Sequence, residues 1–429
     1  MKVLLKNITI NHPLYKLNKK SNILIEDGII SKVSSTAIEE SPGMKVYEMN
    51  GKVAAPGFYD MHVHLREPGR EDEETVVTGC NSAARGGFTG VACMPNTEPA
   101  IDSAEVVHLI LGKAKGHLVD VHPIAAATAE RKGEVIAPIA ELVEAGAVGF
   151  SDDGVAIKTA RVLRRVMEYA KMYDKPVIEH CEDESLAGGA MNEGFNSTFL
   201  GLPPIPPIAE ELTVIRDIMM SEYTGARVHI AHISTKGAVE LVRQGKAKGI
   251  NVTAEVAPHH FSLTDDSLKA YDTNFKMNPP LRARRDVEAI LEGLKDGTID
   301  CIATDHAPHS IEEKEMEFEY APNGIVGLET AVGLAFTELV HKKVITLDKL
   351  IEKFAINPRK ILNLPIPAFE PGEKANITIL DTGAVWTVET SKFLSKCRNS
   401  PFDKMLLTGK AIAAINNGMM YYQEQFIKI

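Results

Sequence analysis

The sequence predicts an α/β fold in which a (β/α)8 barrel of the TIM type carries a small β-sandwich domain formed by both termini. Eight short apolar, β-rich runs alternate with amphipathic helical stretches, which is the pattern of parallel strands joined by helices. The two ends of the chain instead carry short strands separated by turns. A chain of 429 residues also exceeds the roughly 250 residues of a typical barrel, which leaves room for a second domain.

The predicted barrel strands are separated by intervals that can each hold a helix. They occupy residues 53–60, 88–94, 119–126, 147–150, 176–180, 227–232, 250–256 and 299–304. Helical periodicity is clearest at 102–115, 159–173, 208–222, 235–246 and 284–295. Because a parallel barrel places its chemistry at the carboxyl ends of its strands, the residues that follow each run are the candidates for function.

The domain limits follow from where the pattern changes. Residues 1–55 and 366–429 are expected to form one composite β-sandwich domain, and residues 56–365 the barrel. The acidic stretch 312–319, just after the eighth strand, is interpreted as a solvated loop or short helix, with a mobile lid as the alternative.

Composition narrows the class of protein. A net charge of −11 without a basic stripe argues against nucleic-acid binding. No apolar run is long enough to span a membrane, and the first residues resemble a strand rather than a signal peptide. The five cysteines are odd in number and scattered, which is typical of thiols in a reducing compartment, so a cytoplasmic location is expected.

His62 and His64 are the most informative pair in the chain. Side chains at positions i and i+2 of a strand share a face, so both imidazoles can bind one metal ion, and zinc favours such ligands. An isolated pair of this kind is more often found on the surface. Here the ends of other strands carry further potential ligands, namely His180, His232, Asp153 and Asp305.

Several neighbouring residues have a structural interpretation beside the functional one. Asp152 is a candidate for the N-cap of the next helix, Cys181 for the core, and His229 for a packed position that cannot share the face of His232. Two roles remain open for His259 and His260: they could support the metal ligands from behind, or they could be purely structural.

The mouth of the predicted barrel also carries groups suited to a substrate. Arg66 continues the face of His64 and offers a fork for a carboxylate. Asn96, Asn278 and His309 are candidate substrate contacts, with turn or loop roles as alternatives. Four histidines and two aspartates supply enough ligands for two divalent ions bridged by one carboxylate, which predicts metal-assisted hydrolysis of an amide or cyclic amide.

These residues, in this order, resemble the class I dihydroorotases of the amidohydrolase superfamily, and the likeness spans the whole chain. The stretches that carry it are 57–69, 94–97, 151–154, 179–183, 231–234, 277–282, 304–309 and 324–330. The resemblance implies reversible, zinc-dependent cyclisation of N-carbamoyl-L-aspartate to L-dihydroorotate and water. This reaction is the third step of de novo pyrimidine (UMP) biosynthesis.

The resemblance also implies roles for individual residues. One zinc would be held by His62, His64, Asp153 and Asp305, and a second by Asp153, His180 and His232, with Asp153 as the bridge. Asp305 would be the acid/base that takes a proton from the attacking water and gives it to the leaving nitrogen. The substrate carboxylate would contact Arg66, Asn96 and His309, and the ring would contact Asn278 and the loop at Asn323 and Gly324.

Two alternatives remain beside this interpretation. Hydantoinases, allantoinases and class II dihydroorotases carry a carboxylated lysine on strand four, whereas residues 151–153 of this chain include no lysine and Lys158 comes later. Non-catalytic dihydroorotase-like partner subunits lack several ligands, and none is missing here. Asn323 departs from the aromatic residue expected in its loop. A homodimer is expected, while association with aspartate transcarbamoylase and occupancy by one or two zinc ions are left open.

Overall fold

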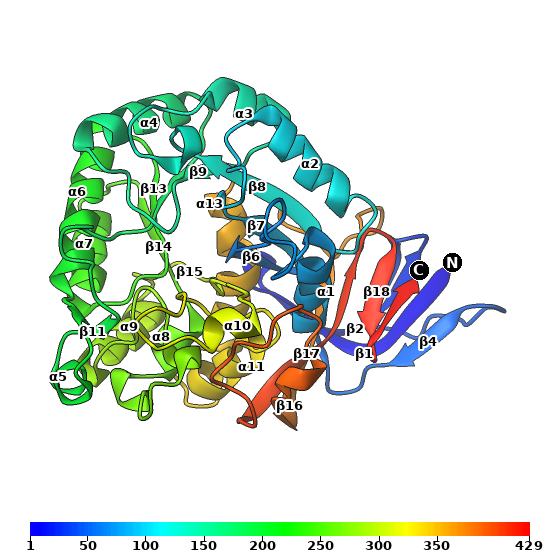
Figure 1. The fold of residues 1–429 in the computed structure, drawn as a ribbon. Coiled ribbons are helices and arrows are strands. Elements are labelled where there is room, and N and C mark those ends of the chain that lie inside the picture. The colour runs from blue at the N-terminus through cyan, green and yellow to red at the C-terminus, as the bar shows by residue number, and fades with distance from the viewer.

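The computed structural model describes residues 1–429, and eight parallel strands form a nearly closed barrel at its centre (Figure 1). The order of the strands along the sheet is the order in the chain. A parallel bridge between Val63 and His306 joins the two edges. The strands are β6 (Phe58–Val63), β7 (Phe88–Cys93), β8 (Asp120–Ala126), β9 (Gly149–Ser151), β10 (Val177–Glu179), β13 (Val228–Ile230), β14 (Val252–Val256) and β15 (Cys301–Ile302).

Helices surround the barrel, and the five predicted from periodicity lie within two residues of their predicted limits. Thr159, rather than Asp152, caps α4, because its side chain accepts a hydrogen bond from the amide of Val162. The helices are α1 (Val76–Gly86), α2 (Ala104–Ala114), α3 (Ile139–Ala145), α4 (Ala160–Met172), α5 (Phe195–Leu200), α6 (Ile208–Thr224), α7 (Lys236–Ala247), α8 (Pro258–Ser262), α9 (Arg284–Asp296), α10 (Ile311–Lys314), α11 (Ala331–Ala335), α12 (Leu347–Ile351) and α13 (Asn357–Ile361).

The interior of the barrel is filled with side chains. Tyr59, Met61, Ile124, Ile178 and Cys301 belong to one buried cluster inside the ring of strands. A larger apolar cluster packs the outer faces of the strands against the helices. Since the interior is solid, ligands reach the barrel only at its two ends, here called the mouth (carboxyl ends of the strands) and the floor (amino ends).

The predicted first strand, 53–60, divides in two. Residues Val53–Pro56 form β5, which pairs with strands of another sheet, and the barrel begins with β6 after Gly57. A side chain at position 57 would collide with Asn376 and Thr89, so only glycine lets the chain pass between the two sheets here. The apolar run correctly predicts extended strand, but it does not reveal that the chain leaves one sheet and enters the other at Gly57.

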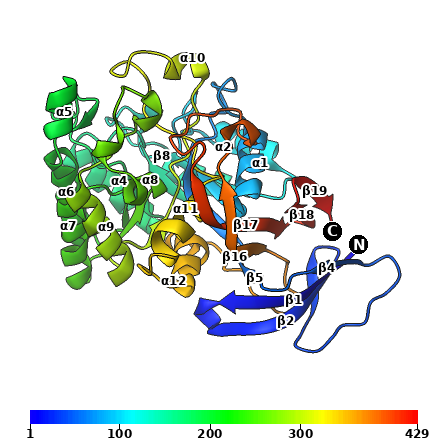
Figure 2. The ribbon, with the colours of Figure 1, turned by 90° about the horizontal axis from the view of Figure 1, so that it is seen from below.

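Strands from both ends of the chain belong to one nine-stranded sheet beside the barrel (Figures 1 and 2). A separate apolar cluster, with Val3, Ile8, Ile25, Ile377 and Ile415 among its members, packs on this sheet. The sandwich arrangement and the domain limits stay predictions. The strands are β1 (Lys2–His12), β2 (Leu17–Glu26), β3 (Ile29–Ser34), β4 (Lys45–Glu48), β5, β16 (Ile377–Thr387), β17 (Leu406–Asn416), β18 (Met419–Tyr422) and β19 (Gln425–Lys428).

Two further strands, β11 (Met191–Asn192) and β12 (Pro204–Ile205), form a small separate pair. No helix combines the length and the apolar character needed to cross a membrane.

Candidate metal centre and substrate pocket

A cavity of about 170 Å³ opens at the mouth of the barrel. All the site residues predicted from the sequence line it except His62, which lies fully buried beside it. Gly154 and Ala307 complete the lining. The residues in the cavity wall are His64, Arg66, Asn96, Asp153, Gly154, His180, His232, Asn278, Asp305, Ala307, His309, Asn323 and Gly324.

Two groups of potential metal ligands meet in this cavity, and Asp153 belongs to both. In the first, Asp153 Oδ1 lies 3.3 Å from His62 Nε2, and Asp153 Oδ2 lies 3.6 Å from His64 Nε2. In the second, Asp153 Oδ1 lies 3.8 Å from His232 Nε2, which faces His180 Nδ1 at 3.0 Å. A carboxylate shared in this way can bridge two cations.

Asp305 approaches the first group from the end of the last barrel strand. Its Oδ1 lies 3.0 Å from His64 Nε2 and 3.5 Å from His62 Nε2. Burial opposes ionisation of this carboxyl, but the hydrogen bond with His64 and the nearby imidazoles outweigh burial and hold the pKa of Asp305 below its usual range. The side chain is therefore an ionised carboxylate that can accept a proton.

The histidines of the first group are oriented by acceptors on their far side. His62 Nδ1 lies 2.6 Å from Glu255 Oε1, and His64 Nδ1 lies 2.7 Å from Asn96 Oδ1. An Nδ1–H donated to these acceptors leaves the lone pair on Nε2, which is the atom that faces Asp153. Asn96, predicted as a substrate contact, thus also orients a potential ligand.

Glu255 was not predicted from the sequence. It lies in β14 and is buried, and it orients His62 through its first oxygen. Its second oxygen lies 3.2 Å from His229 Nε2, close enough for an ion pair but without a hydrogen bond between the two atoms. His229 has Thr253 Oγ1 as its other partner at 2.8 Å and does not line the cavity, in agreement with a packed role. An acidic residue inside an apolar strand was the available signal, because such a group needs a buried partner.

The donor set fits a divalent cation. His62 Nε2 and Asp153 Oδ1 are buried and have no hydrogen-bond partner. Three carboxylates, of Asp153, Glu255 and Asp305, are buried together around the imidazoles. Burial opposes ionisation of Asp153, yet His62 and the neighbouring histidines hold its pKa well below the usual range. Buried negative charge and unpaired nitrogen and oxygen atoms are what a metal ion would satisfy.

The backbone is strained at three residues of the mouth. Arg66, His232 and Asp305 have φ angles of 60°, 27° and 50°, a region that is uncommon for residues other than glycine and that asparagine, aspartate and histidine enter most readily. Each follows a barrel strand, where the chain must turn sharply to aim the side chain into the cavity. Strain of this kind is typical of functional sites, because the surrounding structure maintains it for the geometry that it provides.

Arg66 and His309 are joined by a second residue that the sequence did not reveal. Glu73 Oε2 lies 3.1 Å from Arg66 Nε, and Glu73 Oε1 lies 2.9 Å from His309 Nδ1. Arg66 Nη2 in turn lies 3.1 Å from His309 Nε2. The glutamate side chain is only 2% exposed, so it holds the two predicted substrate contacts in one arrangement.

The far wall of the cavity is formed by Asn278 and the loop at Asn323. Asn278 Nδ2 donates to Glu182 Oε2 at 3.0 Å, while its Oδ1 is buried without a partner. The Asn323 carbonyl lies 2.8 Å from His309 Nε2. Glu182 follows His180 at position i+2, so the rule that identified the pair at 62 and 64 could have found it.

The acidic stretch after the eighth strand contains the short helix α10 beside the mouth. Glu313 lies 2.8 Å from Arg70 Nη2, which connects the helix to the loop after β6. Lys314 is buried and donates to the carbonyls of Pro322 and Gly324 at 2.9 and 3.2 Å. The short-helix interpretation is therefore correct for 311–314, and these contacts tie the segment to the loop at 322–324 in the cavity wall.

The remaining candidates lie outside the cavity. Asp152 accepts hydrogen bonds from the amides of Ala127 and Thr128 at 3.0 Å each, so it orders a loop and is not a helix cap. Cys181 is buried, as expected. His259 and His260 are buried in α8 and do not reach the cavity; His260 Nε2 lies 2.9 Å from the Pro279 carbonyl.

Solved structures share this architecture along the whole chain. The L-hydantoinase (dihydropyrimidinase) of Arthrobacter aurescens aligns with a TM-score of 0.87 at 24% identity, covering 100% of this chain and 97% of that one. The dihydropyrimidinase of Brevibacillus agri aligns with a TM-score of 0.85 at 21% identity, covering 100% and 96%. At these identities the likeness establishes the fold. The fold shared with these structures and the His/Asp clusters together define a barrel suited to binding a metal ion.

Sequence relatives narrow the class. The family model described as dihydro-orotase-like matches residues 51–238. The dihydroorotase of Pelotomaculum thermopropionicum is 49% identical over 429 residues, covering 100% of both chains. That of Acetivibrio thermocellus is 48% identical over 427 residues, covering 99% of this chain and 100% of its own. The chain therefore belongs to the dihydroorotase family.

Proposed function

We propose that this chain is a zinc-dependent class I dihydroorotase, which catalyses the reversible cyclisation of N-carbamoyl-L-aspartate to L-dihydroorotate and water in pyrimidine biosynthesis. The full-length relatives support the activity. The observation that carries the class is the position of Asp153, whose carboxylate belongs to both ligand groups, in a cavity that no lysine lines. This arrangement supports Asp153, and not a carboxylated lysine, as the residue that would bridge the ions.

Zinc would be held by His62, His64, Asp153, His180, His232 and Asp305, as one or two ions per subunit. When bound, such ions lower the pKa of a water molecule and polarise the amide carbonyl. The chain itself supplies the proton transfer. The carboxylate of Asp305 takes a proton from the attacking water and returns it to the ring nitrogen as the amide bond breaks. In the direction of cyclisation the same steps run in reverse.

The substrate carboxylate would bind to Arg66, Asn96 and His309. Arg66 Nε is already occupied by Glu73 and by the Pro308 carbonyl at 3.1 Å, so the outer guanidinium nitrogens are the ones available for a carboxylate. Asn278, with Asn323 and Gly324, would contact the ring from the far wall.

A substrate comparison tests this function. Purified protein loaded with zinc is offered dihydroorotate, hydantoin and allantoin, and we expect turnover of dihydroorotate alone. The arginine at the mouth favours a substrate with a free carboxylate, which hydantoin and allantoin lack. Turnover of only the latter two would assign the chain to the hydantoinase-like alternative. A protein that binds no zinc after chelator-free purification would instead support a non-catalytic partner subunit.

We also propose three properties beyond the reaction. The termini form one β-sandwich domain of residues 1–55 and 366–429, with residues 56–365 as the barrel. The protein acts in the cytoplasm, which is supported by five cysteines that are all buried and free. It is a homodimer, and co-purification with aspartate transcarbamoylase would decide whether the two enzymes associate. The dimer and this association rest on the resemblance described above.

A further inference from the structure

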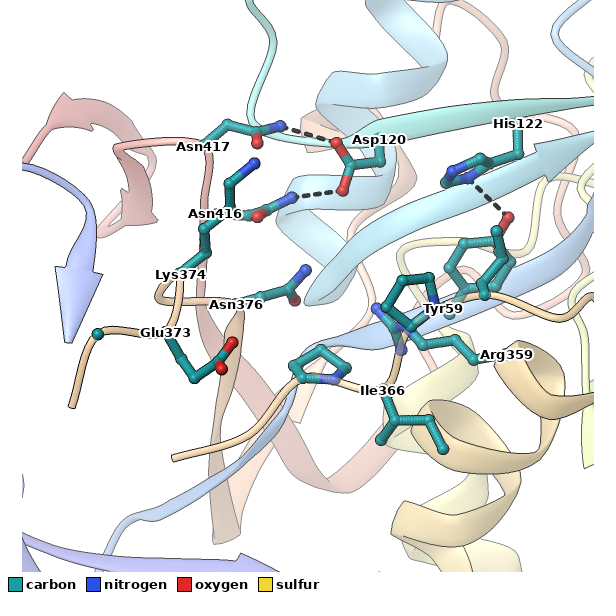
Figure 3. Close-up of a pocket in the computed structure, with 14 residues that line it drawn as sticks. Tyr59, Asp120, His122, Arg359, Ile366, Glu373, Lys374, Asn376, Asn416 and Asn417 are labelled. Atoms are coloured by element: carbon teal, nitrogen blue, oxygen red, sulfur yellow. Dashed lines mark hydrogen bonds between the residues drawn. The ribbon is translucent and has the colours of Figure 1, made fainter. Parts of the chain in front are cut away.

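Figure 3 shows a second cavity, which lies at the floor of the barrel and so at the other end of the strands from the mouth. Its volume is about 510 Å³, compared with about 170 Å³ at the mouth. Tyr59 and His122 reach it from the amino ends of β6 and β8, Arg359 from α13, and Asn376 and Asn416 from the sheet of the termini. None of these residues has a part in the proposed reaction, and a cavity of this size can hold a small organic molecule.

The guanidinium of Arg359 is the main charge in this floor cavity. It is 4% exposed, and its partners are carbonyls and a hydroxyl, with no carboxylate within ion-pair distance. Its Nη1 donates to the carbonyls of Gly57 and Ala355 at 2.5 and 2.8 Å, and its carbon lies 5.1 Å above the Tyr59 ring. Carbonyls and a ring orient a guanidinium but do not neutralise its charge. The nearest acid of the cavity, Asp120, acts on Arg359 only from beyond ion-pair distance. A buried cation without a direct ion-pair partner is costly, which points to an anion as the missing contact.

Two further donors are aimed into the same cavity. The Thr89 hydroxyl donates to Asn376 Oδ1 at 2.7 Å, which leaves the amide Nδ2 as the free end of Asn376. His122 Nδ1 lies 3.0 Å from the Tyr59 hydroxyl. Burial raises the pKa of Tyr59 well above its usual value and lowers the pKa of His122, so both groups are neutral. In the tautomer that accepts the phenol proton on Nδ1, His122 carries its own proton on Nε2. Neither Asn376 Nδ2 nor His122 Nε2 has a protein partner.

The acids of the floor cavity do not compete for these donors. Asp120 accepts one hydrogen bond on each oxygen, from the side-chain amides of Asn416 and Asn417 at 2.9 and 2.8 Å. Glu373 is exposed at the rim, next to the oppositely charged Lys374. The remaining wall is apolar and consists of residues 364–367, Leu-Pro-Ile-Pro.

We propose that the floor cavity binds a small organic anion, a carboxylate or a phosphate monoester. Its charged group contacts Arg359, Asn376 and His122, and its apolar part packs along 364–367. Because the lining comes from both the barrel and the sheet of the termini, the bound anion connects these two parts of the molecule. The site is separate from the metal centre and does not depend on the proposed function.

Binding is tested with simple probes by titration calorimetry on the full-length protein. The probes are benzoate, phenyl phosphate and uncharged benzamide, and the protein carries Arg66→Ala so that anions are not captured at the mouth. We expect benzoate or phenyl phosphate to bind at least about tenfold more tightly than benzamide, since the donors favour a negative charge. The stronger of the two anions identifies the charged group as a carboxylate or a phosphate. Absence of binding by both anions overturns the proposal.

A single substitution locates the probe. Asn376→Asp keeps the size of the side chain but replaces the free donor with a carboxylate, so we expect affinity for the anion to fall by about tenfold or more. The same substitution at the exposed Asn50 should leave affinity unchanged. In the background with Arg66 intact, Asn376→Asp should not alter the KM for dihydroorotate. Unchanged anion affinity in Asn376→Asp overturns the proposal. Arg359→Gln should also lose binding, but Asn376→Asp decides the question if that variant fails to fold.

Discussion

The two ends of the barrel differ in backbone strain and in the pairing of their buried polar atoms. At the mouth, Arg66, His232 and Asp305 have positive φ angles, which are uncommon for residues other than glycine and are least expected for the arginine. Among the residues that line the floor cavity, positive φ occurs only at Gly372 and Asn417, which tolerate it. The backbone is therefore strained at the mouth and relaxed at the floor.

The unpaired atoms differ in the same way. Buried nitrogen and oxygen atoms without partners gather at the mouth, on His62 and Asp153. The floor instead leaves a net positive charge at Arg359, whose Nη1 is fully engaged by carbonyls. The comparison teaches that cavity volume does not locate the reaction, since the floor cavity is the larger one. Strain and orphaned ligand atoms instead distinguish the mouth, where the clusters suited to a metal ion lie, from the floor, where we propose that an anion binds.

The largest difference between the two ends should appear on removal of the proposed acid/base. Asp305→Ala should lower dihydroorotate turnover by at least about 10³-fold, because a positioned proton acceptor and a potential metal ligand are both lost. The fold should persist, as judged by circular dichroism. Asn376→Asp at the floor is the control and should retain full turnover. Full activity of Asp305→Ala would remove this residue from the proposed role.

Metal binding should depend on the shared carboxylate. Asp153→Asn should reduce bound zinc, measured by plasma mass spectrometry after dialysis, and should lower turnover by about 10²-fold or more, because both ligand groups lose a charged member. The neighbouring Asp152→Asn is the matched control, since the hydrogen bonds of that carboxylate come only from residues 127 and 128. Zinc content equal to that of the unaltered protein would show that Asp153 is not the bridge.

A smaller effect on zinc affinity is expected from Glu255, which contacts the potential ligand His62 on the side away from the cavity. Glu255→Gln should weaken zinc affinity by about 10–100-fold, because the amide orients His62 less strongly than a carboxylate does. Competition with a chromogenic chelator measures this change. Thr253→Val, in the same strand, removes a partner of His229 but leaves the contact between Glu255 and His62, so its zinc affinity should not change. Equal losses in both variants would mean that the strand itself was disturbed.

The smallest expected effect concerns the arrangement of the substrate contacts. Glu73→Gln should raise the KM for dihydroorotate by about tenfold and change kcat by less than about threefold, because it loosens Arg66 and His309 without touching the reacting atoms. Steady-state kinetics separate the two parameters. Asp72→Asn, which contacts only the exposed Arg70, is the control. A fall in kcat with constant KM would contradict a positioning role.

Much of the fold could be predicted from local pattern. Helical periodicity placed five helices within two residues, since an amphipathic face is a property of consecutive residues. The apolar run at 53–60 was harder, because apolar character does not tell which sheet a strand joins. Its division at Gly57 depends on the room left by Asn376 and Thr89, which lie far away in the sequence.

The same limit applies to the candidate site: residues placed by local sequence could be predicted, and residues defined by distant partners could not. Residues at strand ends, such as His64 and Asp153, could be named from the sequence, because a barrel brings its strand ends together. Glu255 and Glu73 were missed. Their partners His62 and His309 are 193 and 236 residues away, and no spacing rule connects them.

The sequence by itself determined the barrel, the residues at its mouth and the family, because these depend on periodicity, on the residue types that follow each strand, and on likeness to relatives along the whole chain. Only the tertiary structure decided which carboxylate the two ligand groups share, which glutamates orient their neighbours, and that a buried arginine faces a second cavity. These properties depend on distances of 2 to 4 Å between side chains from separate elements, and such distances are set by packing rather than by local sequence.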